Sequence, residues 1–91
     1  MDEIAQMVRH HHERWDGTGY PDRFIAEEIP ISSRIITIAD AYDAMTSERP
    51  YRKSIRKASV IEEFRRTSGT QFDPRLTNLF IGIISRTDFQ E

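Results

Sequence analysis

The chain has 91 residues, which allows one small domain or one part of a larger domain. It contains no cysteine, which excludes disulfides and thiolate metal sites, and its net charge of -2 gives no broad electrostatic footprint for DNA. No apolar run is long enough to cross a bilayer and no signal peptide is visible, so we expect a soluble, cytoplasmic protein.

The first predicted helix covers residues 1–14, and no Gly or Pro interrupts it. Its side chains with apolar character recur at helical spacing: Ile4, Met7, Val8 and His11. The residues that follow are dense in turn formers, so we expect the helix to stop near Trp15. A long ordered loop is predicted from there to Pro30.

Three further helices are predicted after this loop. One runs from Ile31 to Ser47, with Pro30 in its first turn, and carries an apolar stripe: Ile31, Ile35, Ile38, Tyr42 and Met45. The next covers residues 55–67 with Ser54 as its cap. The last starts at Asp73-Pro74 and runs to about Arg86, with five residues expected to face inward: Leu76, Leu79, Phe80, Ile83 and Ile84. Without β alternation, the predicted fold class is all-α.

Three adjacent histidines precede a glutamate at the end of the first predicted helix, from His10 to Glu13. Neutral imidazoles are the commonest protein ligands for metals. Neighbouring helical residues point about 100° apart, so two adjacent histidines suit two ions of a cluster better than a single ion. Glu13 could orient a histidine or accept a hydrogen bond from a loop N–H. The alternative is a solvated histidine run.

Asp40 follows the apolar segment 35–39, and Asp43 lies three residues later on the same helical face. A carboxylate among isoleucines is costly to bury unless it is paired or bound to a metal. Together with imidazoles, it suits Fe, Mn, Zn or Mg. The alternative is that Asp40 faces solvent beside the stripe. Asp43 is interpreted as structural, pairing with Arg49 or Arg52.

Two shorter segments contain residue types that bind phosphate or allow the backbone to approach a ligand closely. The guanidinium groups of Arg49 and Arg52 can bind phosphate oxygens bidentately, although a solvated basic turn is the plainer alternative. Gly17 and Gly19 let the backbone turn sharply or approach a ligand closely. Neither segment is specific by itself.

Taken together, these segments resemble the HD-GYP family. Residues 11–21 match the family signature HHExxDGxGYP at every specified position. Further segments follow in the family's order and spacing: Ile29-Pro30, Arg34-Ile35, Ala39-Asp40, Asp43-Ala44, Arg49-Pro50-Tyr51 and Gly69-Thr70-Gln71-Phe72-Asp73-Pro74. The resemblance covers about residues 5–84. It implies a helical, HD-domain-like fragment of about four helices with a long ordered loop after the first.

The resemblance also implies a function, in bacterial signal transduction. Members hydrolyse cyclic di-GMP, and a few prefer cyclic GMP-AMP, at a dinuclear or trinuclear site that often holds iron or manganese. By motif position, the implied metal ligands are His11, His12 and Asp40. The implied substrate-binding residues are Arg49, Arg52, Gly19, Tyr20 and Pro21, and the GYP loop is also implicated in contacts with diguanylate cyclase domains. The implied supporting residues are Glu13, Asp16, Gly17 and Asp43.

Two departures from the family pattern matter. Relatives usually carry glycine in place of Arg23 and Ala26, so we expect the loop to change its dihedral angles or to shift. The family's His-Asp pair and following lysine do not occur in this sequence. We therefore expect residues 1–86 to be the C-terminal part of such a domain, with a tail at 87–91 and weak or no activity alone.

An incomplete domain also predicts exposed apolar surface. The residues expected to lose their cover are Ile35, Ile38, Phe80 and Ile83. Such a surface favours a homodimer. The alternative function is therefore a non-catalytic module that binds a nucleotide, a diguanylate cyclase domain or its own copy.

Overall fold

The structure is a computed structural model that describes residues 2–47 and 56–87. In these ranges the chain forms α1 (Glu3–His10), the 3-10 helix η1 (Ala26–Glu28), α2 (Ile31–Thr46), α3 (Lys57–Thr67) and α4 (Pro74–Ser85). Apart from a single bridge between Ser68 and Phe72, no strand pairing occurs in the described part. The prediction of an all-α fold with about four helices and a long loop after the first is confirmed. No helix within those ranges has the length and apolarity needed to cross a membrane.

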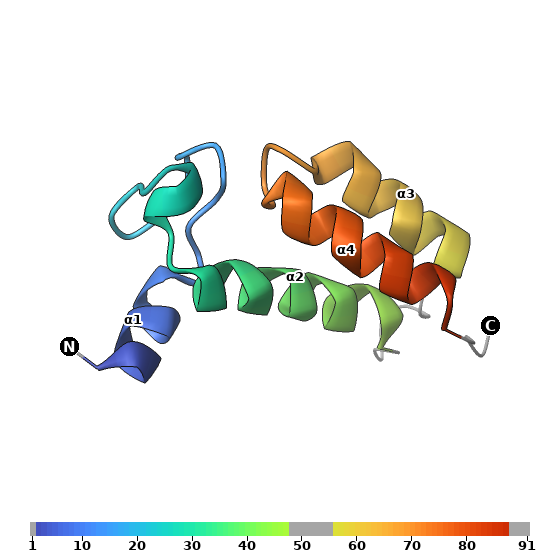
Figure 1. Cartoon of the computed structure of the whole chain (residues 1–91), viewed down its shortest axis with the longest axis horizontal. Coiled ribbons are helices and arrows are strands. Elements are labelled where there is room, and N and C mark those ends of the chain that lie inside the picture. Colours follow the sequence, from blue (N-terminus) through green and yellow to red (C-terminus); the bar gives the residue numbers. More distant parts are fainter. Residues whose placement is uncertain (1, 48–55, 88–91) are drawn as a thin grey trace.

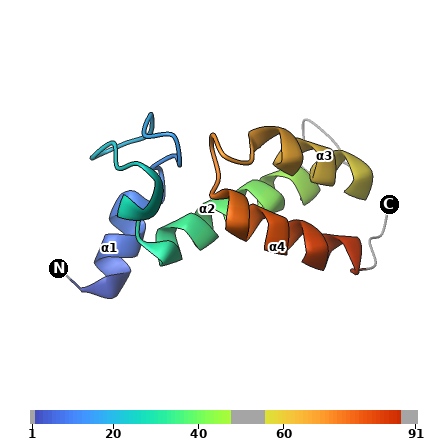
Figure 2. The same cartoon turned by 45° about the horizontal axis from the view of Figure 1, so that its top comes forward.

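Helix α2 is the element on which the others are arranged (Figure 1). Helix α1 packs against it near one end, whereas α3 and α4 lie side by side toward its other end (Figure 2). The loop between α1 and α2 rises on the same side as the α3–α4 connection. Two backbone hydrogen bonds join them, from Trp15 N to Gln71 O at 3.2 Å and from Asp16 N to Thr70 O at 2.9 Å. This junction holds the loop against the α3–α4 connection, above the first turns of α2 (Figure 1).

The hydrophobic core lies between α2, α3 and α4. Phe64 is its centre, with its ring centroid 5.4 Å from that of Phe72 and 5.5 Å from that of Phe80. The buried members of the cluster are Ile38, Val60, Phe64, Phe72, Ile81 and Ile84. Burial of each such side chain stabilises the fold by roughly 1.5–3 kcal/mol relative to an exposed position. Because Ile38, Tyr42 and Met45 belong to or pack against this cluster, it holds the C-terminal half of α2 against α3 and α4.

Helix α1 is shorter than predicted. It ends at His10 rather than near Arg14, because the chain turns there and Glu13 N donates to His10 O at 3.1 Å. The predicted apolar stripe on this helix is wrong as well, since Ile4 and Val8 are exposed and His10 is its buried residue. The reason is tertiary: α1 packs on α2 and on the loop, and Phe24 of the loop covers the face that carries His10.

The other helix boundaries agree with the prediction to within one or two residues. Pro30 is the N-cap of α2 rather than a residue of its first turn. Asp73 caps α4 as predicted, accepting from Arg75 N and Leu76 N, and Pro74 is the first helical residue. The predicted cap Ser54 lies outside the described residues, and α3 follows Arg56 without a side-chain cap.

The face that α4 presents to the core differs from the prediction. Leu79 and Ile83 were expected to face inward, but they are 62% and 52% exposed. Helix α4 instead packs on α2 and α3 through Thr77, Ile81 and Ile84, which are buried.

The expected loss of cover holds for two of the four residues. Ile35 and Ile83 are exposed, as predicted for an incomplete domain. Ile38 is buried and Phe80 is half-buried, because both pack against the central cluster around Phe64.

Candidate metal centre

His11 and His12 follow α1 in a turn, so they do not lie on a helix as predicted. Their rings lie beside one another, with centroids 3.9 Å apart and planes inclined by 40°. The expectation that the two side chains point about 100° apart rested on helical geometry and is therefore wrong. The turn brings two imidazoles to the same place.

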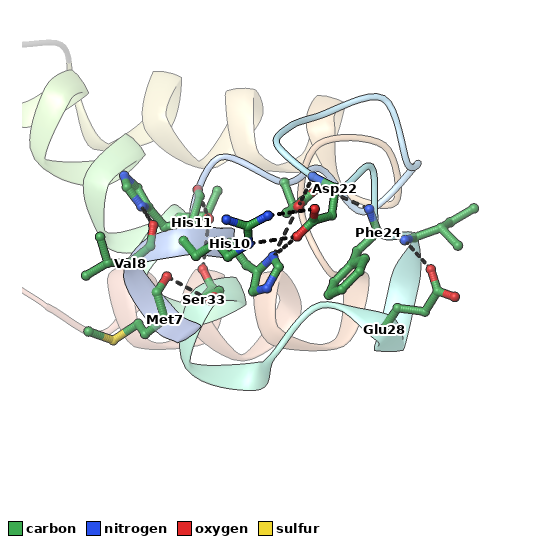
Figure 3. A network of polar contacts seen from close by, with 12 residues as sticks. Met7, Val8, His10, His11, Asp22, Phe24, Glu28 and Ser33 are labelled. Carbon is green, nitrogen blue, oxygen red and sulfur yellow. Dashed lines mark hydrogen bonds and ion pairs between the residues drawn. The ribbon is translucent and has the colours of Figure 1, made fainter. Parts of the chain in front are cut away.

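The His11 ring has a defined tautomer. Its Nδ1 lies 2.5 Å from the carbonyl oxygen of Val8 (Figure 3). A carbonyl only accepts, so Nδ1 carries the hydrogen and donates it, which leaves the Nε2 lone pair available to a cation. The turn is also tied to α2, because Thr37 Oγ1 donates to His11 O at 2.8 Å. Such hydrogen bonds orient metal-binding histidines in proteins.

The two histidines share a pocket with Asp40. This pocket, of about 350 Å³, lies between the turn after α1, the middle of α2 and the α3–α4 connection, and is lined by His11, His12, Glu13, Arg14, Thr37, Asp40, Ala41 and Gln71. Asp40 is exposed beside the apolar stripe of α2 and borders the same space as the imidazoles. Two imidazoles and a carboxylate are residue types that suit a divalent ion of the Fe or Mn type. In this structure, however, the donor atoms of His11, His12 and Asp40 do not all lie within 4.8 Å of one another. Their role as ligands stays a prediction.

A second group of donors lies closer together. Within the described ranges, His10, Glu13 and Asp22 are the residues whose donor atoms all lie within 4.8 Å of one another. His10 Nδ1 is 3.2 Å from Glu13 Oε2 and 3.5 Å from Asp22 Oδ2. The Glu13 oxygens accept from Asp22 N at 2.9 Å and Phe24 N at 3.0 Å, and Asp22 accepts two hydrogen bonds from Arg9. Because these lone pairs already serve donors of the protein, we interpret the group as an anchor for the loop rather than as a cation site.

This anchor was not foreseen in full from the sequence. Glu13 was predicted to orient a histidine or accept from a loop N–H, and it does both, but the histidine is His10 (Figure 3). His10 and Glu13 are 3% and 2% exposed, and the His10 ring stacks on Phe24 with centroids 4.4 Å apart. Arg9 donates to Asp22 and lowers the pKa of that carboxyl. The His10–Glu13 spacing of three residues was the available signal.

The loop after the turn depends on glycine at Gly19. A Cβ there would lie 2.5 Å from His12 O and 2.5 Å from Arg14 N, closer than any side chain tolerates. Gly17 has a φ of 83°, in the left-handed region that favours glycine. The peptide bond between Tyr20 and Pro21 is cis. These features fold the loop back onto the histidine turn.

The two positions where relatives usually have glycine keep a left-handed backbone. Arg23 has a φ of 55° and Ala26 a φ of 52°. Both values lie in the left-handed region that favours glycine, and a change or shift of the loop relative to the family stays a prediction. Asp22 N and Phe24 N on either side of Arg23 are held by Glu13, so the surrounding structure maintains the strained conformation.

Asp16 organises the start of the loop. Its Oδ1 accepts from Thr18 N at 3.0 Å and from Thr18 Oγ1 at 2.6 Å, and its carboxylate pairs with Arg14. These hydrogen bonds favour the ionised form and lower the pKa of Asp16 to about 2. The carboxylate thus supports the loop beside the pocket.

The remaining predicted site residues have different outcomes. Tyr20 and Pro21 are exposed and, with His12, border an open groove beside α1. Asp43 is exposed on α2 and accepts from Ser47 Oγ at 2.9 Å. Arg49 and Arg52, including their predicted pairing with Asp43, lie outside the described residues.

Comparison with known proteins places this arrangement in a family. Residues 1–76 match the HD domain family. The chain is 38% identical over 81 residues to a 3'3'-cGAMP-specific phosphodiesterase of Vibrio cholerae, covering 89% of this chain and 16% of the relative. It is 40% identical over 77 residues to a cyclic di-GMP phosphodiesterase of Thermotoga maritima, covering 85% of this chain and 21% of that protein.

A solved structure agrees with the sequence relatives. The crystal structure of a cyclic GMP-AMP-specific phosphodiesterase from V. cholerae matches with a TM-score of 0.78 and 28% identity, covering 94% of this chain and 20% of that one. The chain therefore spans about a fifth of the length of the proteins it resembles. On the match to residues 1–76 and the signature at 11–21, the chain belongs to the HD domain family, in its HD-GYP branch.

Proposed function

We propose that the chain carries part of the active site of a metal-dependent phosphodiesterase that hydrolyses cyclic di-GMP in bacterial signal transduction. The observation that supports this most is the pocket shared by His11, His12 and Asp40. The relatives named for cyclic di-GMP or cyclic GMP-AMP hydrolysis support the substrate class. Both substrates are cyclic dinucleotides, and the preference between them is part of the test below.

The proposed metal ligands are the His11 imidazole through Nε2, the His12 imidazole and the Asp40 carboxylate. In the whole domain they would contribute to a dinuclear or trinuclear iron or manganese site. Divalent ions held there would supply a lowered pKa of bound water and offset negative charge on the phosphodiester. Val8 O and Thr37 Oγ1 hold the turn that carries His11, which supports this assignment because both contacts restrict the position of the ring.

Substrate binding is assigned to the groups around this pocket. Arg49 and Arg52 are proposed to bind phosphate oxygens, since guanidinium groups do so bidentately. Gly19, Tyr20 and Pro21 are proposed to border the substrate, and exposed Tyr20 and Pro21 are also available to a diguanylate cyclase domain in the cytoplasm.

A different observation favours the alternative, a non-catalytic module that pairs with its own copy. An apolar groove of about 180 Å³ lies between α2 and α4, lined by Ile35, Ile38, Ala39, Leu76, Leu79, Phe80 and Ile83. Three of these large side chains are at least half exposed: Ile35, Leu79 and Ile83. A homodimer would cover this surface.

Metal titration tests the first proposal. The purified chain is titrated with Mn²⁺, free Mn²⁺ is followed by electron paramagnetic resonance, and hydrolysis of cyclic di-GMP and cyclic GMP-AMP is followed by chromatography with Mn²⁺ or Fe²⁺. We expect Mn²⁺ binding with slow hydrolysis, because these three ligands make only part of the site. Asp40→Asn should weaken binding, whereas Asp43→Asn on the same helix removes the same charge outside the pocket and should not.

The two functions have opposite signatures. Loss of both Mn²⁺ binding and turnover in His11→Ala supports the phosphodiesterase. Mn²⁺ affinity that is equal in the wild type, His11→Ala and Asp40→Asn contradicts the ligand assignment. A metal-free chain that forms a tight dimer by light scattering, and that Ile83→Ser converts to a monomer, supports the alternative.

A further inference from the structure

The GYP loop, Gly19-Tyr20-Pro21, packs closely against the turn that carries His11 and His12. Gly19 packs directly on that turn, because a Cβ at this position would be 2.5 Å from His12 O and 2.7 Å from Glu13 Cα. The next residue, Tyr20, donates its backbone N–H to His12 O at 3.3 Å. Only glycine before the tyrosine lets the two segments lie this close.

This approach places the Tyr20 ring on the His12 ring. The two planes are inclined by 19°, and the centroids are 4.9 Å apart. Such nearly parallel aromatic pairs are worth roughly 0.5–1.5 kcal/mol beyond the area they bury. His12 also contacts the His11 ring, so its orientation is defined by ring contacts with two neighbours.

His11 and His12 are oriented by different means. A backbone carbonyl accepts from His11 Nδ1, whereas neither nitrogen of the His12 ring makes a hydrogen bond with residues 2–47 or 56–87. His12 is also exposed, and the contacts of its ring in the described part of the chain are those with His11 and Tyr20. The Tyr20 stack is the contact on the loop side that restricts them.

The tyrosine is itself held in place. The residues just after Tyr20-Pro21 are Asp22 and Arg23, and the buried Glu13 carboxylate accepts from Asp22 N at 2.9 Å. Arg9 donates two hydrogen bonds to the Asp22 carboxylate. The backbone that carries Tyr20 therefore cannot move away from His12 without breaking these hydrogen bonds.

We propose that Tyr20 is a positioning residue that sets the orientation of the His12 imidazole toward the pocket shared with Asp40. The aromatic ring is the part that matters, and the hydroxyl is dispensable. The expected effect on metal binding rests on the proposed function. The effect on the orientation of the His12 ring rests only on the contact between the two rings. Partner groups of this kind typically change metal affinity about 10–100-fold when removed.

The experiment compares Tyr20→Ala with Tyr20→Phe in the whole chain. Carbon–proton correlation spectra report the His12 ring, whose protons are shifted upfield by a stacked aromatic ring. We expect the shift to persist in Tyr20→Phe and to vanish in Tyr20→Ala. Mn²⁺ titration of the same proteins should show an affinity about tenfold weaker in Tyr20→Ala and unchanged in Tyr20→Phe.

The control is Leu79→Ala, which shortens an exposed side chain of α4 that lines neither of the pockets bordered by His12. It should change neither measurement. Unaltered His12 resonances in Tyr20→Ala overturn the proposal, as does an equal loss in Tyr20→Phe. If His12→Ala leaves Mn²⁺ affinity unchanged, the proposed ligand set is wrong, and the ring shifts alone then decide whether Tyr20 orients His12.

Discussion

Arg34 and Asp73, which are 39 positions apart, form a partly buried ion pair with Nη1 and Oδ2 2.8 Å apart. Arg34 also donates from Nε to Ile29 O at 2.9 Å, and its guanidinium carbon lies 5.9 Å from the Trp15 ring centroid. Asp73 is at the same time the N-cap of α4. One pair of side chains thus joins the loop, α2 and α4, and this fixes the walls of the candidate metal pocket relative to each other.

A double-mutant cycle of Arg34→Met and Asp73→Asn measures this junction. Asparagine keeps the cap, because Asn and Asp are equally good N-caps, so the cycle isolates the ion pair. We expect a coupling of about 1–3 kcal/mol in the free energy of unfolding, measured in urea. The exposed pair Glu63–Arg66 is the control and should give about 0.5 kcal/mol or less. Equal coupling in the two cycles would contradict the role of burial.

Glu13→Ala should be among the more destabilising single changes in the chain. It removes the acceptor of Asp22 N and Phe24 N and the charged neighbour of buried His10. Loss of charge-assisted hydrogen bonds at a buried site costs about 3 kcal/mol. Urea unfolding checks this value, with Glu62→Ala on the exposed surface of α3 as the control. A change below about 0.5 kcal/mol, the level of an ordinary surface substitution, would show that the anchor is dispensable.

Ala26→Gly should stabilise the protein. Ala26 has a φ of 52°, and the left-handed conformation costs a non-glycine residue about 1 kcal/mol or more. Glycine removes this strain, and the net gain is about 0.5 kcal/mol because the unfolded chain becomes more flexible. The same substitution at Ala39, inside α2, should cost about 1 kcal/mol. Thermal unfolding of both variants provides the test, and destabilisation by both would refute the backbone assignment.

Stability should fall in acid through Asp16. Its folded-state pKa of about 2 is below the ordinary value of 3.8, so folding favours the ionised carboxylate. The stabilisation is therefore complete above about pH 4 and is lost as the pH falls toward 2. Asp16→Asn should flatten the pH dependence of urea unfolding in this range, while Glu62→Gln should leave it unchanged. Nuclear magnetic resonance titration of the Asp16 carboxyl should give a midpoint near 2, and a midpoint near 3.8 would contradict the hydrogen-bonded arrangement.

Local signals were sufficient for much of the fold. The apolar steps of three and four in residues 31–45 and the pair Asp73-Pro74 predicted α2 and the start of α4, because capping and periodicity act within a few residues. The same reasoning failed for α1. The helical spacing of apolar residues continued past His10, but the chain turns there. The turn lets the Glu13 carboxylate accept hydrogen bonds from loop N–H groups nine and eleven residues away.

The sequence by itself determined the chemistry: three histidines, a carboxylate in an apolar segment and an eleven-residue signature, all read from residue type and spacing. Only the tertiary structure decided which donors share a pocket. His11 and His12 border the same pocket as Asp40 because α1 and the α3–α4 pair both pack on α2, whereas the His10 side chain is part of the loop anchor. Spacing along a chain fixes directions only within one regular element, and these residues come from two helices and the turn between them.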